Sequence, residues 1–255
     1  MALFSPLAVH ARSSLLFSSA PCQRLRSQAL LPLRTQAPCF SSVYSPKPDR
    51  WATRFVTRAA VSQFDPSIGE ILGDVSIFTA AGDPVKFEDL WDQNEGVAVV
   101  ALLRHFGCIC CWELASALKE SKAKFDAAGV KLIAVGVGTP DKARILAERL
   151  PFPMDCLYAD PDRKAYDVLG LYYGFGRTFF NPASVKVFSR FEELKKAGKN
   201  YTIAATPDDR SSVLQQGGMF IFKGKQLLYA RKDEGTGDHT SLDDIFNVCC
   251  KVPVT

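Results

Sequence analysis

Two nearly continuous apolar runs dominate the hydrophobic pattern of this chain. The segments "GVAVVALLRHF", from Gly96, and "VKLIAVGVG", from Val130, predict strands that are buried on both faces of a sheet. Between these runs, apolar residues recur at the spacing of a helix: Cys111, Leu114, Ala115, Leu118 and Phe125. Gly129 then stands where a helix would end. The pattern therefore predicts a buried strand, a helix and a second buried strand.

Shorter elements are expected on both sides of this unit. A pair of strands around a Gly-Asp-Pro turn is predicted within 74–91, a short strand within 154–160, and a hairpin within 217–232. Helices are predicted from Thr139-Pro140, within 162–171, within 185–200 and within 240–252, the last capped by Thr240 or Ser241, while 172–184 is expected to be a loop. Alternating strands and helices imply an α/β sandwich, and the hairpin adds antiparallel strands to its sheet.

The charge of the chain is unevenly distributed. Of 31 basic and 27 acidic residues, residues 1–60 hold eight basic side chains and one acid, Asp49, which gives this segment a charge of +7. The remaining residues hold 23 basic and 26 acidic side chains, a balance of −3. An Arg- and Ser-rich segment with almost no acid is typical of an organelle transit peptide.

We therefore expect residues 1–60 to be a disordered transit peptide, cleaved near Ala59 to Val61, and residues 61–255 to form the domain. The late first Arg, Arg12, and the scattered prolines favour the chloroplast stroma, with the mitochondrion as the alternative. A disordered basic tail is the other interpretation of this segment. Both organelles are reducing, and cysteines there are more often catalytic, redox-sensing or metal-binding than part of a structural disulfide framework.

Composition argues against several classes of protein. No apolar run of about 18 residues occurs, so we expect no membrane-spanning helix and no membrane partner. The acidic balance after residue 60 gives no support for a nucleic-acid-binding face. The chain has neither G-x-G-x-x-G nor a P-loop, so we expect no bound cofactor.

The candidate chemistry lies in "RHFGCICCWE", residues 104–113. Cys108 and Cys111 form a C-x-x-C at the end of a predicted strand and in the first turn of the next helix. The free N–H groups of a helix N-terminus favour a thiolate, and Arg104 and His105 add positive potential. Such a motif beside a β-α-β pattern in a reducing compartment predicts a thioredoxin-like redox site.

In this interpretation Cys108 is the more exposed nucleophile, and Cys111 resolves the oxidised form as an internal disulfide. Cys110 is expected to point to another face of the helix and to be structural. Three alternatives stay open: the cysteines fill the core, they bind zinc or an iron–sulfur cluster, or Cys108 reacts with peroxide without Cys111.

Other chemistry-bearing residues are expected to have structural roles. Cys156 is predicted in the core, and one of Cys249 and Cys250 is predicted to face the core from the last helix. His239 is expected to be a loop or capping residue, and Arg177 a solvated surface residue.

Two segments resemble a known family. "VVALLRHFGCICCWELASAL" resembles the R-H-F-x-C-x-x-C segment of peroxiredoxin-like proteins with an AhpC/TSA antioxidant-enzyme domain, and "QQGGMFIFKGKQLLYARKDEGTGDH" is similar to the Gly-Gly hairpin and Asp-His that end that domain. The resemblance covers roughly residues 65–250 and is specific at 104–111 and 217–239. It implies a thioredoxin-like three-layer sandwich with a mixed central sheet, an antioxidant or oxidoreductase activity, and a redox pair at Cys108 and Cys111. Relatives in the family include prostaglandin-type synthases that reduce a cyclic peroxide with a comparable C-x-x-C.

The chain departs from the best-known patterns of this fold. Peroxiredoxins have P-x-x-x-T-x-x-C, but here the Pro position is Ala101 and the Thr position is His105. Thioredoxins have Trp before the first Cys, where this chain has Gly107, and Pro inside the motif, where it has Ile109-Cys110. "QQGGMF" also has Gly-Gly where thioredoxins carry a cis-proline. Neither chemistry can be transferred whole.

The sequence therefore predicts a thiol–disulfide or peroxide oxidoreductase with an antioxidant or redox role in the plastid. Its substrate would be a peroxide or a disulfide, attacked by Cys108 and resolved by Cys111. An external dithiol of the thioredoxin or glutathione system would restore the pair. The alternative is a non-catalytic thioredoxin-fold binding module with structural or metal-binding cysteines.

Overall fold

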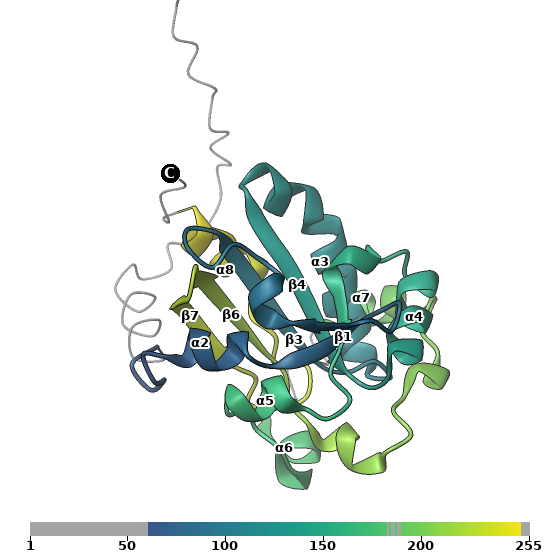
Figure 1. Ribbon diagram of the computed structural model, residues 1–255. Coiled ribbons are helices and arrows are strands. Elements are labelled where there is room, and N and C mark those ends of the chain that lie inside the picture. The colour runs from purple at the N-terminus through teal and green to yellow at the C-terminus, as the bar shows by residue number, and fades with distance from the viewer. Residues whose placement is uncertain (1–60, 183, 185–186, 188–189, 251–255) are drawn as a thin grey trace, which may run out of the picture. The chain divides into compact units, whose positions relative to one another are not determined.

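The computed structural model describes residues 61–250, apart from 183, 185–186 and 188–189. The predicted transit peptide, residues 1–60, lies outside the described residues. The described residues contain a seven-stranded sheet with the strand order β2-β1-β5-β4-β3-β6-β7 (Figure 1). Its strands are β1 (Ser76–Thr79), β2 (Pro84–Lys86), β3 (Val97–His105), β4 (Val130–Val137), β5 (Leu157–Ala159), β6 (Gly218–Lys223) and β7 (Gln226–Lys232).

The sheet is mixed, as predicted. Strands β3, β4 and β5 run parallel, because each is joined to the next through a helix. Strand β6 is antiparallel to β3, and β7 is antiparallel to β6 through a turn at Gly224, whose φ is +52°. At the other edge, β1 pairs antiparallel with both β2 and β5. Every residue of β3 is buried, which confirms the prediction of a central strand.

Helices cover both faces of the sheet (Figure 1). Alternate residues of β3 enter two separate hydrophobic clusters, one on each face. The first cluster packs against α3 (Ile109–Ala127), α4 (Pro140–Arg149), α7 (Phe191–Gly198) and α8 (Leu242–Cys249). The second packs against α2 (Ile68–Gly73) and α5 (Lys164–Val168). The predicted fold class, a thioredoxin-like three-layer α/β sandwich with a mixed central sheet, is confirmed.

Some local predictions differ from the structure. The sequence pattern missed α2, and the predicted loop at 172–184 contains a short helix, α6 (Phe175–Phe179), whose phenylalanines at both ends are exposed. Pro140 begins α4 as predicted, but the Thr139 side chain makes no capping hydrogen bond. Ser241 caps α8 by accepting the N–H of Asp243. Among the described residues, no helix combines the length and the apolar character that crossing a bilayer requires.

Candidate active site

Cys108 lies three residues beyond the end of β3 and is the N-cap residue of α3. Its backbone is extended, and its carbonyl oxygen accepts the N–H groups of Cys111 and Trp112 at 2.9 and 3.2 Å. This arrangement puts the thiol at the positive end of the helix dipole. The side chain is nevertheless buried, with the residue only 6% exposed. Cys108 is the more exposed of the two cysteines, as predicted, but the difference is small because Cys111 is fully buried.

Arg104 provides a fixed positive charge beside Cys108. Its Nη1 lies 3.3 Å from Cys108 Sγ, and the residue is buried. The rest of the guanidinium is held from a distant part of the chain, because Nε donates to the Gln215 carbonyl at 3.0 Å and Nη2 to the Val213 carbonyl at 2.7 Å. Val213 lies in the 3-10 helix η5 (Arg210–Leu214), and Gln215 is the residue that follows this helix. The planar fork of an arginine allows one side chain to bind two carbonyls and a thiolate together.

The three cysteines have different acidities. Hydrogen bonds from the Cys110 and Cys111 thiols lower the pKa of Cys108 well below the ordinary thiol value, against the effect of burial, and Arg104 lowers it further. The pKa of Cys110 is raised by its hydrogen bond to Cys108 and, to a smaller extent, by burial. The pKa of Cys111 is raised mainly by burial and, to a smaller extent, by a hydrogen bond to Cys108. The negative charge is therefore localised on Cys108, with the other two thiols as neutral donors.

Cys110 and Cys111 are both buried around Cys108. Cys111 is fully buried, and its Sγ accepts the backbone N–H of Arg104 at 3.2 Å. Cys110 is also buried, and its thiol is near enough to lower the pKa of Cys108. The structure therefore brings Arg104, Cys108 and Cys111 together and adds Cys110 as a third neighbouring thiol.

The segment after α7 covers the loop that leads into α3. The Tyr201 hydroxyl donates to the Gly107 carbonyl at 2.9 Å, and a Cβ on Gly107 would lie 2.1 Å from Thr206 Oγ1. Glycine is required at 107 because the two backbones approach so closely. Helix α7 itself packs on α3 through Ala197 and Leu194. The helix predicted within 185–200 therefore covers α3.

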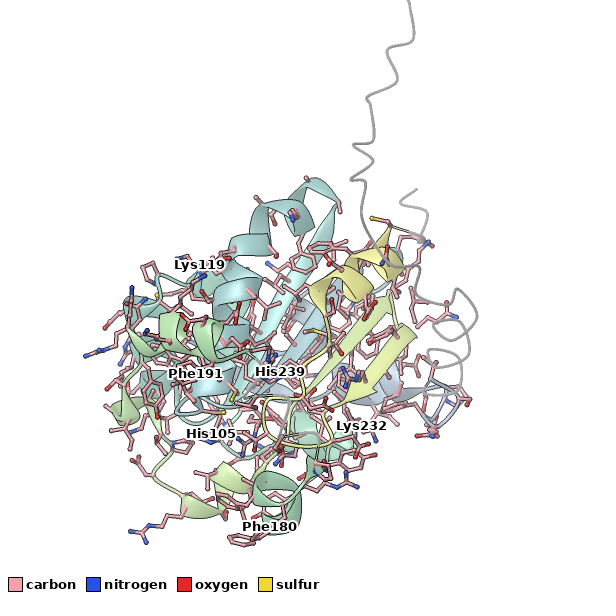
Figure 2. The ribbon with its side chains drawn as sticks, turned by 180° about the vertical axis from the view of Figure 1, so that it is seen from behind. His105, Lys119, Phe180, Phe191, Lys232 and His239 are labelled. Atoms are coloured by element: carbon pink, nitrogen blue, oxygen red, sulfur yellow. The ribbon has the colours of Figure 1, made fainter. Side chains whose placement is uncertain are left out.

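His105 ends β3 and lies in the interior (Figure 2). Burial lowers its pKa to about 4, with the nearby Cys108 opposing and Arg104 reinforcing the shift. The imidazole is therefore neutral at neutral pH. Its Nδ1 is buried and has no hydrogen-bond partner within the described part of the chain.

His239 and Asp233 form a pair beside the cysteines that the sequence pattern did not indicate. His239 Nδ1 lies 2.9 Å from Asp233 Oδ2, and Nε2 lies 3.2 Å from the carbonyl oxygen of Cys110. His239 therefore contacts the first turn of α3 (its place is seen in Figure 2) and does not cap α8. The only signal of this contact in the sequence was the Asp238-His239 pair after the hairpin. His239 is 129 residues from Cys110, so no local pattern connects the two residues.

The remaining candidates lie apart from these cysteines. Cys156 is buried, and of the last two cysteines Cys249 is buried and Cys250 exposed, as predicted. Arg177 is partly exposed as expected, and it forms an ion pair with Glu234 over the ring of Tyr172. Within the described ranges, no group of three or more His, Cys, Asp or Glu is arranged to hold a metal ion.

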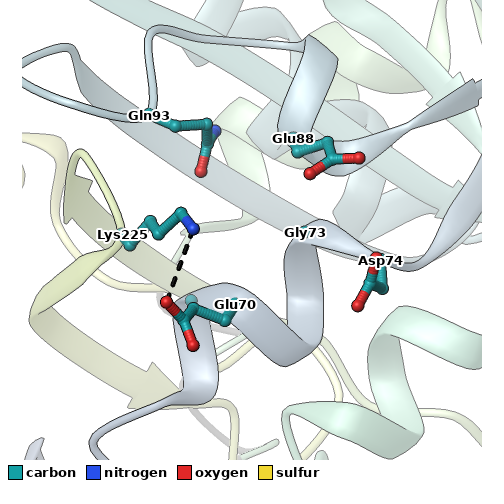
Figure 3. A pocket seen from close by; sticks show the side chains of 7 residues that line it. Glu70, Gly73, Asp74, Glu88, Gln93 and Lys225 are labelled. Atoms are coloured by element: carbon teal, nitrogen blue, oxygen red, sulfur yellow. Dashed lines mark hydrogen bonds and ion pairs between the residues drawn. The ribbon is translucent and has the colours of Figure 1, made fainter.

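A shallow polar hollow lies at the opposite end of the sheet (Figure 3). Lys225 and Glu70 face each other across it, with Nζ 3.4 Å from Oε1. Lys225 lies two residues after Lys223, which pairs with the first residue of β3. Cys108 lies three residues after the last residue of β3. The length of β3, about 3.3 Å per residue, separates the hollow from the cysteines, so it takes no part in their chemistry.

Comparison with known proteins gives a consistent set of similarities. A family model described as "AhpC/TSA antioxidant enzyme" matches residues 117–235, a range that begins after the three cysteines. The chain is 33% identical over 181 residues to the chloroplastic thioredoxin-like protein AAED1 of Arabidopsis thaliana, covering 70% of this chain and 71% of the relative. It is 28% identical over 182 residues to a prostamide/prostaglandin F synthase of Aquarana catesbeiana, covering 68% of this chain and 84% of that one.

Among solved structures, the peroxidoxin BcpB of Mycobacterium tuberculosis matches with a TM-score of 0.47 and 12% identity, covering 71% of this chain and 93% of that chain. Peroxiredoxin Q of Xanthomonas campestris matches with a TM-score of 0.48 and 12% identity, covering 72% and 92%.

Proposed function

Because this chain belongs to the peroxiredoxin-like family of AhpC/TSA antioxidant enzymes, we propose that it is a thiol-dependent oxidoreductase in which Cys108 reduces a peroxide or a disulfide. The observation that carries this proposal is the position of Cys108 Sγ, at the N-terminus of α3 and 3.3 Å from the guanidinium of Arg104. A thiolate is the reactive form of cysteine in both reactions, and this environment favours the thiolate.

The first step would be attack of the Cys108 thiolate on the substrate. With a peroxide ROOH, the sulfur bonds to one oxygen, the O–O bond breaks, and a proton from solvent or a neighbouring thiol completes the alcohol ROH. Cys108 is oxidised to a sulfenic acid and the peroxide is reduced by two electrons. With a disulfide, the thiolate displaces one sulfur and forms a mixed disulfide.

The second step would be resolution by Cys111. Its sulfur attacks Cys108, releases water or a thiol, and leaves a Cys108–Cys111 disulfide. Cys111 is fully buried and neutral, so it must lose its proton as the leaving group takes one. An external dithiol then returns two electrons and restores both thiols.

The reaction would take place in the plastid. We propose that residues 1–60 are a transit peptide and that residues 61–255 are the imported domain. The basic charge of the first 60 residues supports this assignment, as does the name of the Arabidopsis relative, which is chloroplastic. Expression of the full chain fused to a fluorescent protein would test it, and retention of the fusion in the cytosol would contradict it.

The chemistry can be tested by alkylating the full chain across a pH series and measuring each cysteine peptide by mass spectrometry. We expect Cys108 to titrate well below the ~8.5 of a free thiol, and peroxide or oxidised glutathione to link it to Cys111. If Cys108 titrates as an ordinary thiol and no such disulfide forms, the proposal is wrong. Zinc that co-purifies with the protein and is released by a thiol reagent would then support the metal-binding alternative.

A further inference from the structure

A buried histidine–aspartate pair lies against the first turn of α3. The side chains of His239 and Asp233 are 4% and 3% exposed, and His239 Nδ1 is 2.9 Å from the Asp233 carboxylate. The other ring nitrogen, Nε2, is 3.2 Å from the carbonyl oxygen of Cys110. An ionised carboxylate and a carbonyl can only accept hydrogen bonds. A neutral imidazole has one N–H, so two donated bonds require the doubly protonated ring.

We infer that His239 is an imidazolium that serves as a positioning residue for Cys108, holding the first turn of α3 by its carbonyl and placing a buried positive charge next to the redox cysteines. This inference rests on the proposed function, since it concerns the stabilisation of the same thiolate. Arg104 would then be one of two cations around Cys108, one on a strand and one on the loop that follows β7.

The charges around His239 favour its protonated form. Burial lowers the pKa of His239, but the charge of Asp233, its hydrogen bond to the ring and the nearby Cys108 together raise the pKa above 6.5. Arg190 lowers it, while Glu113 of α3 lies on the same side and interacts with the ring. Electrostatic coupling between two groups is reciprocal. A thiolate that stabilises the imidazolium is therefore itself stabilised by it.

The loop that carries His239 is packed directly on Cys110. A Cβ on Gly237, whose φ is +74°, would lie 3.2 Å from Cys110 Sγ. Arg190 donates to the Gly237 carbonyl, and its Nε is 3.4 Å from Glu113 Oε1. The loop after β7 therefore contacts α3 at Cys110 and, through Arg190, at Glu113. These contacts hold the imidazole beside its two acceptors.

Two substitutions remove the positive charge of the His239 ring and keep a hydrogen bond to the Cys110 carbonyl. In Asp233→Asn the amide can donate to Nδ1, so a neutral His239 still donates from Nε2 to the carbonyl. In His239→Gln the amide nitrogen can donate to the same carbonyl without a charge. Asp160→Asn is the control, because Asp160 is equally buried but caps the start of α5.

The first readout is the protonation state of the His239 ring by nitrogen-15 NMR of the full-length wild-type protein at pH 7. We expect two protonated nitrogens in the wild type and one in Asp233→Asn. The second readout is the apparent pKa of Cys108 by pH-dependent alkylation. We expect it to rise by about half a unit to one unit in His239→Gln, by less in Asp233→Asn, where the carboxylate charge is lost together with that of the ring, and not in the control.

A wild-type ring with a single protonated nitrogen would overturn the inference, whether or not the variants fold. So would folded variants, verified by circular dichroism, in which Cys108 keeps the low pKa of the wild type. A wild-type Cys108 that titrates like a free thiol would contradict the proposed function instead, and the two failures are thereby distinguished.

Discussion

Replacing Arg104 by methionine removes the guanidinium that lies 3.3 Å from Cys108 Sγ. At that distance two unit charges attract each other by about 5 kcal/mol if the effective dielectric constant is about 20. Part of this attraction is offset by the desolvation of both buried groups, and an opposite charge at this range typically shifts a pKa by about 1–3 units. We therefore expect the apparent pKa of Cys108 to rise by about 1–3 units, each unit being about 1.4 kcal/mol of differential stabilisation.

The same substitution also affects folding, because Arg104 donates to the carbonyls of Val213 and Gln215. Each buried carbonyl left without a donor costs about 1–3 kcal/mol. Arg104→Lys separates the two effects, since lysine retains the charge but lacks the planar fork that reaches both carbonyls and the sulfur. We expect Arg104→Lys to lose stability with a smaller rise in the pKa of Cys108 than Arg104→Met.

The assay is the rate of iodoacetamide alkylation of Cys108 between pH 4 and pH 10, with the modified peptide quantified by mass spectrometry. Arg144→Met is the matched control, because Arg144 is exposed on α4 and pairs with Asp141. The reasoning is refuted if Arg104→Met is folded by circular dichroism and its Cys108 titrates with the wild-type pKa. A pKa that rises equally in the Arg144 control would also refute it.

Three further predictions concern the neighbours of Cys108. Peroxide should convert Cys111→Ser to a Cys108 sulfenic acid that dimedone traps, whereas a Cys108–Cys110 disulfide in that variant would identify Cys110 as the resolving thiol. Gly107→Ala should lower the free energy of unfolding in urea by about 1–3 kcal/mol, since the new Cβ would lie 2.1 Å from Thr206 Oγ1, and an unchanged midpoint would contradict the close approach. The pKa of His105 in the folded protein is about 4, below its ordinary value of 6.5. Between these two pH values the unfolded chain binds more protons than the folded protein. The free energy of unfolding that the neutral ring contributes is therefore lost as pH falls from 6.5 to 4. The free energy of unfolding should fall over this range by roughly 3 kcal/mol more in the wild type than in His105→Gln, and equal pH slopes would show that the ring does not titrate as argued.

The local pattern of this sequence determined most of the secondary structure. The apolar run of β3, the helical spacing of α3 and the Gly-Gly hairpin all depend on residues a few positions apart, and a single sequence records such short-range preferences. The same pattern located the C-x-x-C at a strand-to-helix junction. It failed at α2 and α6, because these helices have only 6 and 5 residues, too few to show a period.

The environment of the three cysteines at the start of α3 was decided by the tertiary structure. Arg104 is fixed by carbonyls more than 100 residues away, at Val213 and Gln215, and the Cys110 carbonyl is bound by His239. The segment at 201–206 covers Gly107 in the loop that leads into α3, and no local pattern indicated this contact. No periodicity links such residues, because their contacts arise only when the loops after α7 and β7 fold back onto the start of α3. The sequence thus determined which residue types could carry redox chemistry, whereas long-range packing decided which thiol is acidic and which cations surround it.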